Sequence, residues 1–86
     1  MRESIHEKVD VVVTFTRAFG GAFPKRVRWQ GKEYNISEVG MHHMVREGRI
    51  LHHIFSVTAN TLFFRLDFNT ETLQWQIAEI SDGLPS

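Results

Sequence analysis

Cysteine is missing from this chain of 86 residues, and its absence excludes several kinds of chemistry. The protein can form no disulfide, no thiolate zinc site and no cysteine nucleophile. The same absence fits a reducing compartment, so we expect a cytoplasmic protein. At this length the chain makes one domain, 1–86, with a thin core.

An excess of one charge and a long apolar segment are also missing. Ten Lys and Arg balance ten Asp and Glu, so the formal net charge is zero. This balance argues against a surface that attracts polyanions everywhere, although it is compatible with a local basic patch. No segment approaches the roughly 20 apolar residues of a membrane-spanning helix. The first ten residues are too charged for a signal peptide. We therefore expect a soluble protein with no membrane partner.

Helical periodicity is scarce, and alternation with a period of two takes its place. The stretch from Val9 to Thr16 alternates in this way and is rich in β-branched residues, which predicts a first strand. Gly20, Gly21 and Pro24 then break the pattern and predict a loop.

A hairpin is predicted around the Gln-Gly pair at residues 30–31, because glycine accepts the positive φ of a primed two-residue turn. This register sets Val27 opposite Tyr34 and Arg28 opposite Glu33, so one pair is apolar and the other is oppositely charged. Three more hairpins are predicted, with turns at residues 46–48, 59–60 and 70–71. They pair His42 with His52, Phe55 with Phe64, and Leu66 with Trp75.

These patterns agree on an all-β fold, a small antiparallel meander of about six strands curled into a barrel or half-barrel. A β-bulge is predicted at residues 38–40, where the inward parity shifts. We expect residues 1–8 and 81–86 to be loosely ordered ends.

Two pairs of histidines stand out, His42-His43 and His52-His53. Neighbours in a strand point to opposite faces, and the predicted register places His42 opposite His52 on the outer face. At about 4.5–5.5 Å between their Cβ atoms, the two could share a zinc, nickel or copper ion. Two ligands seldom make a metal site, so polar surface residues and a pH-dependent switch are alternative interpretations.

A basic hairpin gathers Arg26, Arg28 and Lys32 around Trp29. Small barrels bind single-stranded nucleic acid through basic grooves and stacked aromatic rings, so these four residues are a candidate nucleic-acid site. The alternative is a solvated sheet face that guards an edge, with Trp29 capping the core.

The predicted outer face of the histidine hairpin also carries Met44, Ile50 and Ile54. That is too much apolar surface for a solvated face. Self-association is the simplest explanation, because most soluble oligomers are symmetric homodimers.

Catalytic signals are few. The serines lie in no nucleophile-elbow setting, and no glycine-rich loop leads into a helix that could hold phosphate. We therefore expect no enzymatic activity and no cofactor.

The stretch from Val9 to Val39 combines a Val-rich strand, a loop, a proline and the line Arg-x-x-Trp-x-Gly-x-x-Tyr-x-Ile-x-x-Val, which starts at Arg26. In this respect the chain resembles a small, functionally uncharacterised family of bacterial all-β domains. Members are sometimes associated with error-prone polymerase-like proteins, so the resemblance implies a role near nucleic-acid metabolism. It covers about a third of the chain, and the His-rich second half departs from the family pattern. The resemblance implies no catalytic residue.

The leading functional expectation is a non-enzymatic protein-interaction module that self-associates. A weak nucleic-acid-binding module is the first alternative, and a histidine-based metal or pH sensor is the second.

Overall fold

The computed structural model describes residues 2–16 and 21–82, which form antiparallel strands and no helix. The all-β prediction is confirmed, with seven described strands where about six were expected. The strands are β1 (Arg2–Thr16), β2 (Gly21–Trp29), β3 (Lys32–Asn35), β4 (Glu38–Glu47), β5 (Ile50–Ala59), β6 (Leu62–Asn69) and β7 (Gln74–Ser81). A helix of the length and hydrophobicity needed to cross a membrane is therefore not found among these residues.

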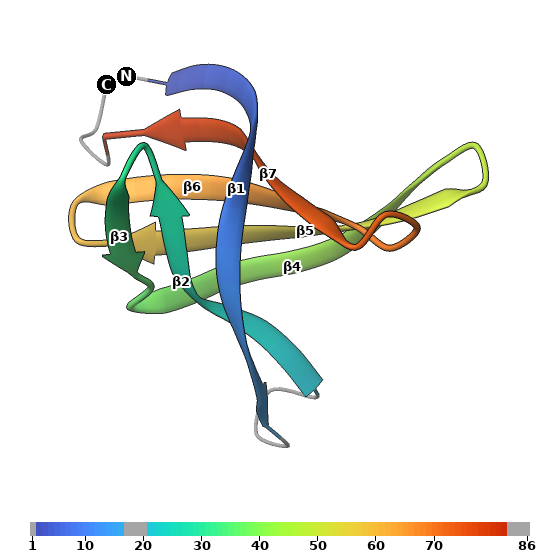
Figure 1. Ribbon diagram of the computed structural model, residues 1–86, viewed down its shortest axis with the longest axis horizontal. Helices are drawn as coiled ribbons and strands as arrows, with labels where there is room; N and C mark the ends of the chain where they lie inside the picture. Colours follow the sequence, from blue (N-terminus) through green and yellow to red (C-terminus); the bar gives the residue numbers. More distant parts are fainter. Residues whose placement is uncertain (1, 17–20, 83–86) are drawn as a thin grey trace.

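The long strand β1 joins the two parts of one sheet, whose order is β3-β2-β1-β7-β6-β5-β4. Its first half pairs with β7 and its second half pairs with β2. Between these halves β1 bends at an irregularity where His6 has a φ of 55°. As a result β1 and β2 run across the direction of the other long strands (Figure 1). Within the segment expected to be a loose end, residues 2–4 and 7–8 pair with β7. Of the loose end expected at 81–86, residues 83–86 lie outside the described part of the chain.

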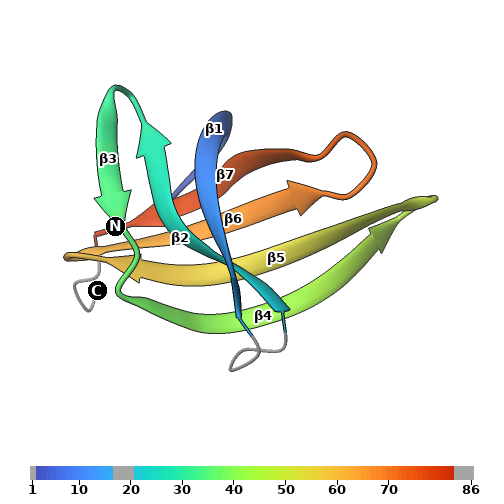
Figure 2. The same ribbon diagram turned by 60° about the horizontal axis from the view of Figure 1, so that its bottom comes forward.

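A short linker closes one side of the curled sheet. β3 and β4 are consecutive in the chain but lie at opposite edges of the sheet. The Ile36 N–H donates to the Lys25 carbonyl at 2.8 Å, and the Ser37 N–H donates to the Thr58 carbonyl at 2.8 Å. The linker therefore touches both β2 and β5, and the sheet becomes a half-barrel (Figure 2).

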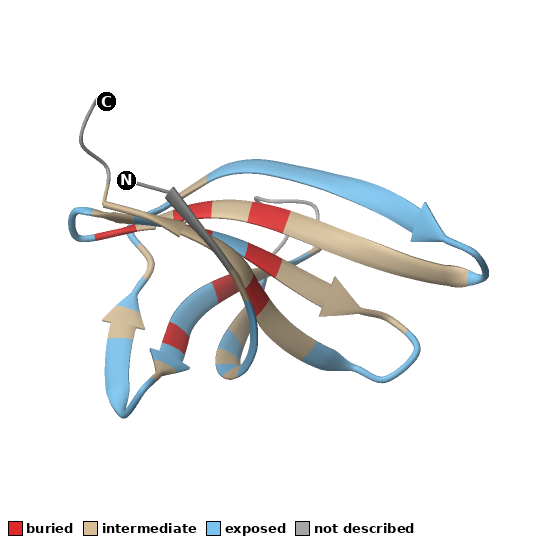
Figure 3. Ribbon diagram, turned by 90° about the horizontal axis from the view of Figure 1, so that it is seen from above, coloured by how far each residue is buried: buried red, intermediate tan, exposed pale blue. Residues whose placement is uncertain are grey.

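The core lies inside this curl, under the crossing of the two parts of the sheet (Figure 3). Its buried apolar residues come from four strands: Val27 of β2, Phe55, Val57 and Ala59 of β5, Phe64 and Leu66 of β6, and Ile77 of β7. Trp29 and Tyr34 pack their rings against Phe64, with centroids 6.3 Å and 5.3 Å away. Among the described residues no charged or polar side chain is buried, so apolar packing holds the centre together.

Three of the predicted registers keep the correct faces. The β2–β3 hairpin pairs Val27 with Tyr34 as predicted. The β5–β6 hairpin is shifted by two residues, so Phe55 lies opposite Leu66. The β6–β7 hairpin is shifted by two residues from its turn to Leu66, so Phe68 lies opposite Trp75, and by three beyond the bulge between Arg65 and Leu66. A shift of two leaves every side chain on its predicted face, because the side chains of a strand alternate with a period of two.

The register of the β4–β5 hairpin differs from the predicted one, and the difference changes which histidines lie together. Its turn is the two-residue segment Gly48-Arg49, which sets Glu47 opposite Ile50. The predicted three-residue turn differs from this by an odd number of positions, so it placed β4 on the wrong face relative to β5. The predicted bulge is confirmed by the register shift between Val39 and Met41.

Candidate functional site

Two histidines from adjacent strands meet on the inner face of the half-barrel. His42 of β4 lies opposite Phe55 of β5, and their rings stack with centroids 4.4 Å apart and planes 8° from parallel. The Nε2 atom of His42 lies 2.8 Å from Nδ1 of His53. The bulge between Val39 and Met41 explains this arrangement, because the extra residue turns His42 rather than Met41 toward the inner face.

The surroundings of His42 favour its neutral form. Partial burial lowers the pKa of His42 below the ordinary 6.5, and the nearby imidazoles of His53 and His43 lower it further. A neutral imidazole has one N–H donor and one acceptor nitrogen. In the hydrogen bond between His42 and His53, one ring therefore donates and the other accepts.

An apolar cleft of about 410 Å³ opens beside this histidine pair. One wall comes from β1 and β2 and includes Phe15 and Phe23. The other wall comes from β5, β6 and β7 and includes Phe55, Phe68 and Trp75. The Trp75 ring packs on both phenylalanines of its wall, with centroids 4.8 Å from Phe68 and 5.6 Å from Phe55. We call the paired strands β1 and β2 the β1–β2 arm, and the paired strands β4 and β5, which carry His42, His53 and Phe55, the β4–β5 arm. The cleft lies between these two arms.

A second polar group lies on the outer face. His52 Nδ1 is 2.7 Å from Asp67 Oδ1, and His52 Nε2 is 3.7 Å from Glu47 Oε1. Gln76 donates to the other oxygen of Asp67 at 3.4 Å. The Nε2 atom of His52 is buried and has no hydrogen-bond partner in the described part of the chain. This Asp–His pair ties β5 to β6 but presents no open nitrogen to a substrate, so we assign it a structural role.

The predicted pairing of His42 with His52 is wrong. His42 lies opposite Phe55 on the inner face, whereas His52 lies opposite Val45 on the outer face. The odd shift at the Gly48-Arg49 turn separates the two rings. Within residues 5–15 and 21–82, no cluster of three or more His, Asp or Glu side chains could hold a metal ion.

The predicted interaction surface is divided between two faces. Met44 lies opposite His53 and shares the inner side, whereas Ile54 lies opposite His43 on the outer side together with Ile50. The expectation that Met44, Ile50 and Ile54 form one patch is therefore corrected. The apolar residues of the outer side of this arm are Met41, Val45, Ile50 and Ile54.

Strand β4 is an exposed edge of the sheet. β4 pairs with β5 along one edge, and no described strand pairs with its other edge. Every residue from Gly40 to Glu47 is exposed. Met41, Met44 and Val45 leave 60%, 61% and 44% of their surface accessible. The β4 edge therefore carries exposed apolar side chains and lacks a partner in the described part of one chain.

The basic hairpin places its arginines beside acidic residues. Arg26 forms an ion pair with Glu33 at 3.4 Å and donates to the Asn35 side chain at 3.1 Å. Arg28 lies opposite Glu33 on one side and Asp10 on the other. The hollow next to this hairpin, about 610 Å³, is lined by Glu7 and Asp10 as well as by Lys8 and Arg28. Such mixed charge suits solvent better than a polyanion.

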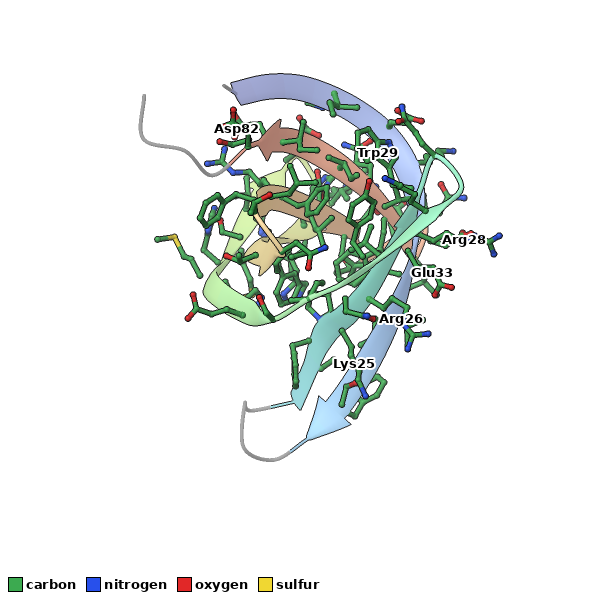
Figure 4. The ribbon with its side chains drawn as sticks, turned by 90° about the vertical axis from the view of Figure 1, so that its left-hand side faces the viewer. Lys25, Arg26, Arg28, Trp29, Glu33 and Asp82 are labelled. Carbon is green, nitrogen blue, oxygen red and sulfur yellow. The ribbon has the colours of Figure 1, made fainter. Side chains whose placement is uncertain are left out.

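Trp29 is separated from those arginines. Its ring packs inward with Tyr34 and Phe64, while Arg26 and Arg28 extend from the opposite side of the strand (Figure 4). Lys32 is exposed at the turn, opposite Trp29. The four predicted nucleic-acid residues thus share one hairpin but not one face.

Sequence reasoning did not find the cleft. Its walls belong to strands far apart in the sequence, and only the crossing of β1 over the rest of the sheet brings them together. One sequence signal was available: the apolar alternation of Val9, Val11 and Val13 continues to Phe15. In the structure Phe15 lies beyond the core and is 80% exposed. An apolar face that runs past the core is the expected mark of an open cleft.

No protein-family model, no curated protein and no solved structure matches this chain.

Proposed function

We propose that this protein is a non-enzymatic interaction module that self-associates by pairing β4 of one copy with β4 of another. The exposed β4 edge is the observation that carries the proposal. An unpaired strand presents a row of backbone N–H and C=O groups, which a second strand can satisfy by extending the sheet.

The two edges of the sheet differ in how well they are protected. β3 has only four residues and includes Lys32 and Glu33, and short charged edges resist pairing. β4 has ten residues. Its stretch from Met41 to Val45 contains no proline, lysine or acidic residue, so it lacks the usual protection of an edge.

A two-fold antiparallel arrangement suits the side chains of β4. With His43 at the centre, Met41 lies opposite Val45 of the partner subunit, and His42 lies opposite Met44 of the partner subunit. The first pair is apolar, and the second sets a methionine thioether against an imidazole. The arrangement places no two residues of like fixed charge opposite each other. The same patch serves both copies, as a symmetric dimer requires.

Sedimentation velocity over a concentration series tests this proposal. We expect the wild type to dimerise and the double variant Met41→Lys, Val45→Lys to need at least about tenfold higher concentration, because like charges would face each other across the pair. Leu73→Lys is the matched control, since Leu73 is 69% exposed in the β6–β7 turn. A wild type that stays monomeric at high micromolar concentration would contradict the proposal.

Nucleic-acid binding has less support as an alternative. Arg26 and Arg28 are exposed on one side of their hairpin, but Glu33 and Asp10 offset their charge. Trp29 packs into the core and is not placed to stack on a base.

A further inference from the structure

The cleft between the β1–β2 arm and the β4–β5 arm has the properties of a small-molecule site. Its volume of about 410 Å³ lies within the range of about 300–1,000 Å³ that is typical of such sites. None of its described lining residues carries a fixed charge, and most of them are aromatic. Flat aromatic walls favour a flat aromatic occupant, because offset or edge-to-face ring contacts add to the gain from burying apolar surface.

One wall of the cleft is held in place by packing. Phe55 is 6% exposed and lies between the His42 ring at 4.4 Å and the Trp75 ring at 5.6 Å. Trp75 in turn contacts Phe68 at 4.8 Å. A surface that is already ordered loses little entropy when a ligand binds.

The histidine pair gives this apolar cleft one hydrogen-bond donor and one acceptor. If His42 Nε2 donates to His53, then His42 Nδ1 is an acceptor and His53 Nε2 carries a proton. If His53 Nδ1 donates instead, the roles of the two outer nitrogens are exchanged. In residues 5–15 and 21–82, no hydrogen-bond partner is found for either outer nitrogen. The pair can therefore match a ligand group that donates or one that accepts.

We propose that the cleft binds an uncharged, planar aromatic compound with one hydrogen-bonding group, such as a phenol or a nitrogen heterocycle. The ring packs against Phe55 and Trp75, and its polar group bonds to an outer nitrogen of the His42–His53 pair. A charged ligand is disfavoured, because the described lining offers no residue of opposite fixed charge to offset its desolvation.

Naphthol, methylnaphthalene and naphthoate make a matched set of probes, followed at neutral pH by amide NMR shifts and calorimetry. We expect naphthol to bind saturably and about three- to tenfold more tightly than methylnaphthalene, which is the contribution of one hydrogen bond. Naphthoate should bind more weakly than naphthol. The double variant His42→Phe, His53→Phe keeps an aromatic ring at both positions, removes both outer nitrogens and should abolish the preference for naphthol. His43→Phe, the same change one residue away on the opposite face, should preserve it.

A second variant tests the location of the site. Ala22 lines the cleft and is exposed, so Ala22→Trp should fill the space without disturbing the core, and should abolish binding of all three probes. The proposal is overturned if naphthol causes no saturable shifts in the wild type, if the double variant His42→Phe, His53→Phe keeps the preference, or if Ala22→Trp still binds. It does not rest on self-association, because the Met41→Lys, Val45→Lys variant keeps the cleft and should bind naphthol as the wild type does.

Discussion

The environment of His42 links the stability of the protein to pH. Partial burial and the neighbouring histidines His53 and His43 lower the pKa of His42 in the folded protein below its unfolded value of 6.5. Between these two values the unfolded chain binds more protons than the folded one, so the free energy of unfolding rises with pH. The stabilising effect is fully present above the unfolded pKa and is lost as the pH falls through the lowered, folded pKa.

We therefore expect His42→Phe to flatten the dependence of stability on pH between about pH 5 and about pH 7.5. Urea unfolding of wild type and variant across this range provides the measurement. Gln74→Asn, which removes no titratable group, should leave the slope as it is in the wild type. Equal slopes for the wild type and His42→Phe would show that folding does not lower the pKa of His42.

The sequence pattern could not predict on which face of the sheet the histidines lie. Alternation assigned Phe55, Val57 and Phe64 to the inner face correctly, because an exposed position would cost these apolar side chains much of their burial energy. His42 and His52 are compatible with either face, so the pattern could not correct an error in the turn. The predicted turn at 46–48 and the observed turn at 48–49 both contain Gly48, and the difference between them decides which histidines meet.

The β2–β3 hairpin shows how a single element can be improved. Gln30 and Gly31 have φ values of 52° and 76°, the two positive values of a type I′ turn. Glycine adopts this conformation at no steric cost, whereas glutamine does not. Asparagine tolerates it better than other residues with a side chain, and Asn-Gly is the preferred pair for this turn.

Gln30→Asn should therefore stabilise the protein by about 0.5–1 kcal/mol. Chemical denaturation with a fitted midpoint and slope is the appropriate measurement. Gln74→Asn is a matched change at the first residue of β7, where asparagine has no such advantage and should not stabilise. A gain of similar size at both positions would exclude the turn as its cause.

At the level of elements, the sequence predicted the inward faces of β5 and β6 but not their cross-strand partners. The turns after β5 and β6 each lie close to the predicted positions, but next to each turn the register is displaced by two residues. Phe55 was expected opposite Phe64 and lies opposite Leu66. Both are apolar and both point inward, so the sequence pattern alone cannot distinguish the two registers.

The half-barrel as a whole depends on the linker that joins its two edges. The N–H groups of Ile36 and Ser37 donate to carbonyl groups of β2 and β5. Almost every residue type has these backbone groups, so the amino-acid sequence gives no signal for the two bonds. For this reason the closure could not be predicted in detail, although the curled meander could. The crossing of β1 over the sheet could not be predicted from the sequence either, because it too depends on backbone pairing, with β2 and β7.

Ser37→Pro removes one of these donors and should destabilise the protein by about 1–3 kcal/mol, because the Thr58 carbonyl loses its backbone partner. Hydrogen exchange should become faster in β3, while β6 and β7 stay protected. Ser37→Ala removes only the hydroxyl bond to the same carbonyl, at 3.1 Å, and should cost less than about 1 kcal/mol. If proline and alanine had the same effect on exchange in β3, the linker would not be what closes the sheet.

The pairing of β1 with β7 also determines when the sheet can be completed during synthesis. The ribosome releases β1 first and its neighbour β7 only after the five intervening strands, since Arg2 pairs with Ser81. Until then a strand from the middle of the finished sheet has a partner on one side only. Long-range pairings of this kind form slowly. A nascent chain therefore presents β1 as a temporary open edge to other nascent chains, until β7 emerges after the other described strands and covers it.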